Sequence, residues 1–253
     1  MFFVFPVLAP LSNLIYFLAA VLPACFLLRY VYRHDTVEKE PAPLLCSLLG
    51  MGCLAALCSA ILEAVAEQLL LILVDPSSPV YTILLACLVV AVVEEGTKFF
   101  FLKLRSWRHS AFNYRFDGVV YAVFVSLGFA ALENIQYVVN YGLSVALPRA
   151  LLAVPGHAAF SVFMGVYYGR AKLLENLGDY GGSRRCLRKG YFFAVFLHGF
   201  YDTCAMIGTA QASAVFLLFV VLMFTAAFRA LKRESSADGP TAPYGGPSAP
   251  FDL

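Results

Sequence analysis

The sequence predicts an all-α polytopic membrane protein with seven transmembrane helices, its N-terminus outside the cell and its C-terminus in the cytoplasm. Three observations predict this fold. Of 253 residues, 61% are hydrophobic and only 13% are charged, whereas charged residues make up about 25% of a soluble domain. Apolar runs recur along the whole chain. The basic residues gather in alternate connecting segments, as short cytoplasmic loops require.

The apolar runs set the number of helices. About 20 apolar residues are needed to cross the hydrocarbon core of a bilayer. Seven runs qualify or nearly qualify, at residues 5–28, 42–73, 79–102, 118–139, 147–169, 190–209 and 211–228. The second run is longer than a span needs, which predicts a tilted or protruding helix. No basic segment precedes the first run, so we expect it to remain as an anchor and not to be cleaved as a signal peptide.

The orientation follows from the basic residues. After the first, third, fifth and seventh runs come Arg29, Arg33, Lys39, Lys103, Arg105, Arg108, Arg115, Arg170, Lys172, Arg184, Arg185, Arg188, Lys189, Arg229, Lys232 and Arg233. These are 16 of the 18 Lys and Arg residues; the other two are Arg149 and Lys98. The segments after these runs are therefore predicted to be cytoplasmic. The net charge of +2 gives no reason to expect nucleic-acid binding.

Two further features define the domain organisation. Residues 1–233 form one predicted integral membrane domain, and residues 234–253, rich in Pro, Gly, Ser and Ala, are predicted to be a disordered cytoplasmic tail. The seven cysteines show no spacing typical of a metal or redox motif. We interpret most of them as small hydrophobic residues.

Ionisable residues inside the apolar runs indicate function. Each costs about 2.5 to 3.5 kcal/mol at the centre of a membrane helix, so each needs a reason to be there. The third to sixth runs contain Glu94, Glu95 and Lys98, then Phe129 and Glu133, then His157 and Ser161, then His198 and Asp202. A single Glu-Lys pair or a single histidine is often structural. Two acidic and two histidine-bearing helices together favour a shared site.

Depth in the bilayer supports such a site. At about 1.5 Å per residue, Glu94 and His198 each lie roughly 13 Å from the cytoplasmic edge. Glu133 and His157 lie roughly 10 and 12 Å from the outer edge. In a hydrocarbon layer about 30 Å thick, all four side chains are near the midplane. The sequence therefore predicts one polar chamber between four helices.

Helical spacing orders the side chains within this chamber. Lys98 is one turn from both glutamates, while Glu94 and Glu95 point about 100° apart, so one can face the chamber and the other can be structural. His198 and Asp202 share one helix face. The Pro155-Gly156 pair should weaken the helix just before His157. Glu63 and Glu67 share a face of the over-long second run, and we expect a structural role for both.

These motifs, in this order, resemble the PrsW family of bacterial intramembrane proteases. The matching patterns are EExxK at Glu94, FxxxE ending at Glu133, HAxFS at His157 and HxxxD at His198. Residues 35–41, DTVEKEP, are similar to a further family signature. The resemblance covers about residues 35–202. It implies a multi-pass protein of the bacterial plasma membrane that makes the first cut in a membrane-spanning anti-sigma factor, within the superfamily of CAAX proteases and bacteriocin-processing proteins.

Peptide hydrolysis needs an activated water, an oxyanion stabiliser and an acid for the leaving amine. Glu94 is our predicted base, with Glu95 as the alternative, and Glu133 would help to hold the water. Two mechanisms remain open. His157, His198, Glu133 and Asp202 can supply the ligands of a divalent metal such as zinc, or the histidines can act as oxyanion donors without metal. Asp202 could instead orient His198.

Two other classes of function compete with the protease. Chains of intramembrane Glu, Asp and His also form proton relays, so a proton-coupled transporter would use similar residues. A noncatalytic scaffold could bind client helices in the same groove. The transporter predicts ion flux without peptide cleavage, and the scaffold predicts that His198→Ala leaves function intact. In all three cases the partners are a lipid bilayer and, for protease and scaffold, a transmembrane protein.

Overall fold

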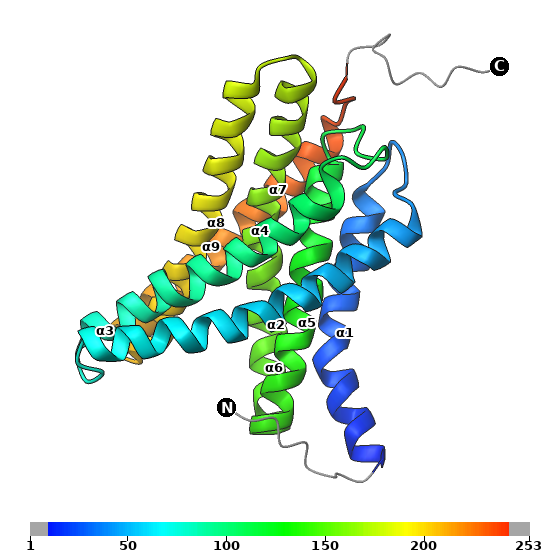
Figure 1. The fold of residues 1–253 in the computed structure, drawn as a ribbon. Helices are drawn as coiled ribbons and strands as arrows, with labels where there is room; N and C mark the ends of the chain where they lie inside the picture. The colour runs from blue at the N-terminus through cyan, green and yellow to red at the C-terminus, as the bar shows by residue number, and fades with distance from the viewer. Residues whose placement is uncertain (1–9, 243–253) are drawn as a thin grey trace, which may run out of the picture.

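The structure, a computed structural model, describes residues 10–242 as a bundle of long helices (Figure 1). The long helices are α1 (Pro10–His34), α2 (Ala42–Leu73), α5 (Asp117–Tyr141), α7 (Val154–Asn176), α8 (Tyr180–Ile207) and α9 (Ala210–Ser236). Shorter segments are α3 (Pro79–Leu84), η1 (Leu85–Ala91), α4 (Val92–Ser106), η2 (Leu143–Val145), α6 (Ala146–Pro148) and η3 (Arg149–Ala153). Within these residues the only strand-like pairing is one bridge between Tyr114 and Pro240.

Six helices of the described chain are long and apolar enough to cross a membrane. Segments α3, η1 and α4 form one of them, at Pro79–Ser106, and the segments from η2 to α7 form another, at Leu143–Asn176. The all-α membrane fold is thereby confirmed. The remaining predicted span, the run at residues 190–209, lies in α8, which has 28 residues but carries a strongly basic first half. It packs along α7 and against η1 and α9.

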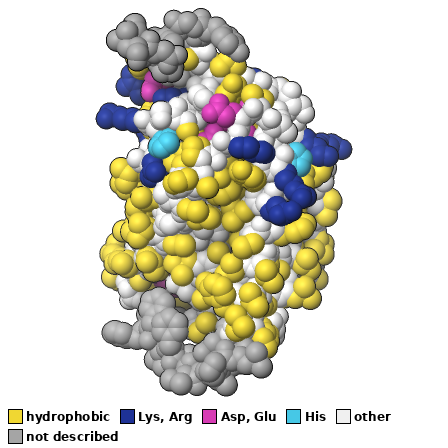
Figure 2. All heavy atoms as spheres, turned by 90° about the vertical axis from the view of Figure 1, so that its right-hand side faces the viewer, with side chains coloured by type: hydrophobic (Ala, Val, Ile, Leu, Met, Phe, Trp, Pro, Cys, Tyr) yellow, Lys and Arg dark blue, Asp and Glu magenta, His cyan; other side chains and the backbone are white. Residues whose placement is uncertain are grey.

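The surface shows where the polar and apolar parts of the bundle lie. Hydrophobic side chains cover the middle and lower part of the face in Figure 2, and basic and acidic side chains gather near its upper end. This end carries the connections between α1 and α2, α4 and α5, and α7 and α8 (Figure 1). It is the end that the sequence predicts to be cytoplasmic.

Several helices continue beyond their predicted limits at this end. Helix α1 reaches His34, and α9 reaches Ser236, so the predicted start of the tail at residue 234 falls inside α9. Beyond α9, Asp238 Oδ1 accepts a hydrogen bond from Phe116 N at 2.9 Å, and Thr241 N donates to Asn113 O at 2.7 Å. The start of the first run and the rest of the predicted tail lie outside the described residues.

Polar and glycine residues define the ends of α8 and α9. Asp179 caps the start of α8, with its Oδ1 accepting from Gly182 N at 2.7 Å. Gly208 ends α8 with a φ of 70°, a left-handed conformation that favours glycine. Thr209 then caps α9 by accepting from Ala212 N. The chain therefore reverses between the two helices within two residues.

Close packing of α5 on α7 forms the centre of the bundle. Gly165 and Gly169 are one turn apart on α7, where a small residue lets two membrane helices approach. A Cβ atom at Gly169 would lie 2.0 Å from Arg115 O, and one at Gly165 would lie 2.5 Å from Val119 Cα. Only glycine fits these positions. The close contact places the α5 residue Glu133 beside the α7 residue His157.

Two π-helical segments precede the helices that carry the predicted site. Segment η1 ends just before α4, and η3 ends just before α7, where Pro155 lies in the first turn. The helix remains continuous across Pro155, although proline removes one backbone hydrogen bond. Wider turns of this kind are frequent at functional sites. They lie three residues before Glu94 and four residues before His157.

Candidate active site

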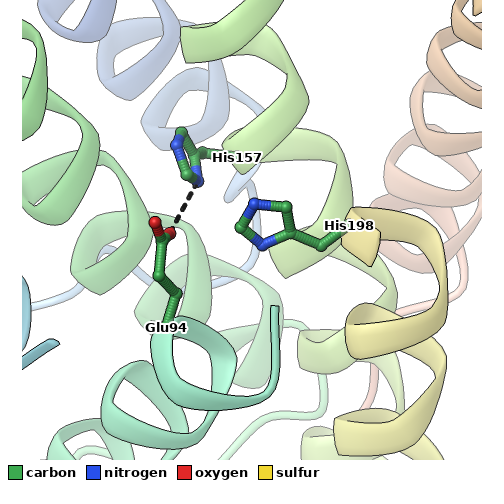
Figure 3. A group of neighbouring side chains, drawn as sticks. All are labelled: Glu94, His157 and His198. Atoms are coloured by element: carbon green, nitrogen blue, oxygen red, sulfur yellow. Dashed lines mark ion pairs between the residues drawn. The ribbon is translucent and has the colours of Figure 1, made fainter. Parts of the chain in front are cut away.

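Three buried side chains from three helices converge in the interior. Glu94 of α4, His157 of α7 and His198 of α8 point toward one another (Figure 3). They are between 3 and 5% exposed. One ligand atom from each lies within 4.8 Å of the others, and Glu94 Oε2 is 4.0 Å from His157 Nδ1. The helices therefore gather groups that are 104 residues apart in the chain.

Lys98 joins these groups from one turn further along α4. Its Nζ donates to Glu94 Oε2 at 2.9 Å and to Glu95 Oε1 at 2.8 Å, and it lies 3.0 Å from His157 Nδ1. An ammonium group only donates, so Nδ1 must be the acceptor in this contact. The proton of neutral His157 is then on Nε2. This nitrogen lies 3.0 Å from Glu133 Oε2, to which it donates.

Arg149 completes the ionic contacts of Glu133. Its Nη2 donates to Glu133 Oε2 at 2.8 Å, and its Nε donates to Asn134 Oδ1 at 2.8 Å. The guanidinium carbon lies 3.8 Å from the centre of the Tyr137 ring. Sequence reasoning did not assign this residue to the site. The sequence did contain one indication of its importance, because Arg149 is the only basic residue in the connections predicted to lie outside the cytoplasm.

His198 is held between two carboxylates. Its Nδ1 lies 3.0 Å from Glu95 Oε1, and its Nε2 lies 3.2 Å from Asp202 Oδ2. Ionised carboxylates only accept hydrogen bonds, so this arrangement favours an imidazolium that donates from both nitrogens. The ring also stacks on Phe160, with centroids 4.7 Å apart. The one-turn spacing to Asp202 was the sequence basis for expecting this contact.

A chamber of about 750 Å³ opens beside these residues. The predicted site residues that line it are Glu94, Glu133, His157, His198 and Asp202. Glu95 is fully buried behind them, at 0% exposure. The predicted convergence of four helices is therefore present. Ser161, quoted with the His157 motif, instead donates to Ala158 O within its own helix.

The two acidic residues of α2 have different surroundings. The sequence favours a structural role for both. Glu67 accepts a hydrogen bond from Tyr81 Oη at 3.2 Å, which fits that interpretation. Glu63, however, lines the chamber, and its Oε1 is buried without a hydrogen-bond partner in the described part of the chain. The length of the second run predicted a tilted or protruding helix. It did not reveal that Glu63 of this helix faces the chamber.

Comparison with known proteins identifies the family. Residues 40–228 match the model of the PrsW family intramembrane metalloproteases. The chain belongs to the PrsW family. It is 33% identical over 226 residues to Protease PrsW of Geobacillus kaustophilus, an alignment that covers 88% of this chain and 94% of the relative. It is 29% identical over 222 residues to Protease PrsW of Bacillus subtilis, covering 87% and 95%. No solved structure matches the chain.

PrsW membership establishes the activity class and the compartment. The protein is an intramembrane protease of the bacterial cell membrane. This confirms the sequence-based prediction of the family, the enzyme class and the membrane location. A protein substrate within or next to the lipid bilayer follows from the activity.

The donor set of the site fits a divalent metal. Glu94, His157 and His198 form a two-histidine, one-carboxylate group of the kind that binds catalytic zinc. Both histidines were predicted as ligands, whereas the carboxylate of this group is Glu94. Glu133 and Asp202, the predicted acidic ligands, contact His157 and His198 instead. Since Lys98 Nζ contacts both Glu94 and His157 Nδ1, metal binding there would require Lys98 to turn toward Glu95. It would also require one nitrogen of His198 to lose its proton and its contact with a carboxylate.

Proposed function

We propose that this PrsW protease makes the first cut in a membrane-spanning anti-sigma factor, with Glu94 as the general base. The substrate class rests on the family resemblance in the sequence. The chemistry rests on the chamber, which lies among transmembrane helices and carries carboxylate and imidazole groups on one wall. A single-pass substrate would place an unwound stretch of its helix against this wall, because helical peptide bonds are shielded.

One observation carries the choice of Glu94. Its carboxylate lines the chamber, whereas Glu95 Oε1 is held by both Lys98 and His198 behind the wall. A base must reach the water that it activates. Glu94 would take a proton from this water, the hydroxide would attack the scissile carbonyl carbon, and the proton would pass to the leaving amine. Glu95 would hold Lys98 and His198 in place.

The histidines and Glu133 would serve the other steps. His198, as an imidazolium whose two N–H groups contact Glu95 and Asp202, would stabilise the developing oxyanion through its positive charge. Asp202 keeps this ring oriented from one turn away. Glu133 accepts from His157 and Arg149, and would help to position the water through its remaining lone pairs. A metal held by Glu94, His157 and His198 would supply Lewis-acid polarisation of water or carbonyl, in place of the roles that Glu94 and His198 have without it.

The test is cleavage in proteoliposomes. The purified full-length chain would be reconstituted with a candidate anti-sigma factor, and product would be followed with and without chelator while bound metal is quantified. We expect one cut within or next to the substrate helix, and none with His198→Ala. Ion flux without cleavage would favour the transporter. Cleavage that persists in a metal-free sample would favour glutamate and histidine chemistry alone.

A further inference from the structure

A second cavity, separate from the catalytic chamber, lies between α4 and α8. It has a volume of about 760 Å³. Its floor is apolar or aromatic, with Gly96 and Phe99 from α4 and Leu187 and Tyr191 from α8. Helix α8 packs more extensively on η1 than on α4, and α4 and α8 diverge toward the predicted cytoplasmic end (Figure 1). We call this cavity the basic groove.

Four basic side chains form the rim of the basic groove. These are Lys103, Arg184, Arg185 and Arg188, and all four are exposed. No acidic residue lines the groove. Among residues 10–242, no ion pair involves any of the four. Lys103 Nζ lies 5.5 Å from the centre of the Trp107 ring, and Arg184 Nε donates to Tyr180 O at 3.3 Å.

This arrangement exceeds what membrane topology alone requires. The preference of cytoplasmic loops for Lys and Arg explains why basic residues occur in the α7–α8 connection. It does not require four of them to surround one cavity with an aromatic floor. A ligand that complements the groove has a negative head and an apolar body. Basic pockets between membrane helices on the cytoplasmic side bind anionic lipid head groups.

We propose that the basic groove binds an anionic phospholipid of the cytoplasmic leaflet. The phosphate would lie among Lys103, Arg184 and Arg188, because a guanidinium can donate two parallel hydrogen bonds to phosphate oxygens. An acyl chain would run along Phe99 and Tyr191 toward the bilayer centre. A free phosphate ion would satisfy the rim but would leave this floor uncovered.

The position of the basic groove links it to the active site. Gly96 directly follows Glu95, and Tyr191 Oη donates to Val92 O at 3.1 Å, two residues before Glu94. Tyr191 is also seven residues, or two turns, before His198 on the same face of α8. A lipid in the groove would therefore contact both of the helices that carry Glu94 and His198, and would hold the distance between them.

The experiment measures lipid binding directly by native mass spectrometry. The full-length chain would be delipidated in detergent and titrated separately with phosphatidylglycerol, phosphatidylcholine and inorganic phosphate. We expect phosphatidylglycerol to be retained. We expect Arg184→Gln with Arg188→Gln to weaken its binding about 30-fold, because each basic residue near a lipid surface contributes about a factor of five. The charge-conserving pair Arg184→Lys with Arg188→Lys should bind more tightly than the glutamine pair and less tightly than the unchanged chain, because it keeps the charge but loses the paired guanidinium hydrogen bonds; it also shows that the region folds.

A matched control separates a site from a generally basic surface. The double variant Arg229→Gln with Lys232→Gln removes two exposed charges near the predicted cytoplasmic end of α9, outside the basic groove. It should leave the binding of phosphatidylglycerol unchanged. Equal losses in the two double variants would overturn the proposal. Equal retention of phosphatidylcholine would also overturn it. If inorganic phosphate or an acidic peptide displaced the lipid from the chain, the groove would be an anion or peptide site instead.

Discussion

Two regions of the chain contain buried carboxylates, and the two groups of carboxylates have different partners. In the chamber, Glu94 and Glu95 contact Lys98 at 2.9 and 2.8 Å, and Glu133 contacts Arg149 at 2.8 Å. At the predicted cytoplasmic end, Asp35, Glu40 and Asp117 are buried, and none of them forms an ion pair within residues 10–242. We call these three the cytoplasmic acidic cluster. Glu40 accepts from Tyr121 Oη, Asp117 Oδ2 accepts from Asn113 N and Tyr114 N, and both Asp35 oxygens lack a hydrogen-bond partner within residues 10–242.

The difference shows what each region requires of its carboxylates. A charge buried in a membrane protein is stable only when it is paired. In the chamber, Glu94 and Glu95 are paired with Lys98, and Glu133 is paired with Arg149. In the cytoplasmic acidic cluster the alternative is protonation. Burial raises the pKa of Asp35 to about 6, although Lys39 opposes the shift. Burial also raises the pKa of Glu40 to about 7. The three chamber acids therefore have cationic partners, whereas Asp35 and Glu40 of the cluster titrate near neutral pH.

The largest expected effect comes from removing one carboxylate from each region. Glu94→Gln keeps the shape of the side chain but removes the base, so we expect cleavage to fall by at least about 100-fold. Glu40→Gln can still accept from Tyr121 Oη and should keep near-normal cleavage. Both variants would be compared in proteoliposomes at equal protein amounts. Substantial cleavage by Glu94→Gln would remove Glu94 from the mechanism and would turn attention to Glu95.

The second effect is a difference between the two ends of the helix bundle in their labelling by a reagent added outside the cell. Ser236 ends α9 beside the cluster, and Ser144 lies in η2 at the opposite end, and both are exposed. In a background without the native cysteines, we expect Ser144→Cys to react with an impermeant maleimide added to intact cells. We expect Ser236→Cys to react only after lysis. The reverse pattern would invert the orientation and place the cluster outside the cell.

Some of this comparison could be predicted from the sequence. The depth and spacing of Glu94, Glu133, His157 and His198 predicted one chamber, because helical rise and period are fixed by backbone geometry. Arg149 and Glu63 were not assigned to the chamber. Their positions depend on how η3 and α2 pack against α5, which no local period encodes. The α8 helix also extends ten residues before its predicted start, because the basic turn at Arg184 hides a continuous helix from a hydropathy criterion.

The cytoplasmic acidic cluster was also hard to predict, because its residues meet only through the packing of distant segments. Asp35 and Glu40 lie in a short polar connection, while Asp117 begins α5 about 80 residues later. Their burial depends on the chain after α9, where Gly239 O accepts from Arg115 N at 3.0 Å. Composition predicts a tail that cannot form a core, and this stretch does not form one. It pairs with the α4–α5 connection through backbone hydrogen bonds, which composition does not reveal.

The third prediction concerns stability and the pairing in the chamber. Lys98→Met leaves Glu94 and Glu95 buried without their shared cation, so we expect a loss of about 3 to 5 kcal/mol. Lys39→Met is the matched control, since Lys39 is exposed and donates only to backbone carbonyls of Tyr32 and Asp35; it should change stability by less than about 1 kcal/mol. Thermal unfolding in detergent measures both. Equal effects would show that the chamber carboxylates are already protonated.

The smallest effect is a pH dependence from the cytoplasmic acidic cluster. The Asp35 carboxyl has a pKa of about 6 in the folded chain against 3.8 as its ordinary value. The folded state therefore holds the proton to higher pH, and this contribution to stability, complete below about pH 4, is lost as pH rises through about 6. Asp35→Asn removes the charge without changing shape. We expect it to raise stability at pH 8 by about 1 kcal/mol, or about 2–4 °C in Tm, and to change little at pH 4.

The control for this effect is Glu38→Gln, which removes an exposed carboxylate from the same connection. It should change the difference in Tm between pH 4 and pH 8 much less than Asp35→Asn does, because Glu38 is exposed and a glutamine there can still accept the hydrogen bond from Asn113 Nδ2. If Asp35→Asn instead lowered Tm at pH 8, the ionised Asp35 would have a stabilising partner, and the cluster would resemble the chamber. A selective gain at pH 8 would mean that the two regions solve the burial of acids in opposite ways, by pairing in one and by protonation in the other.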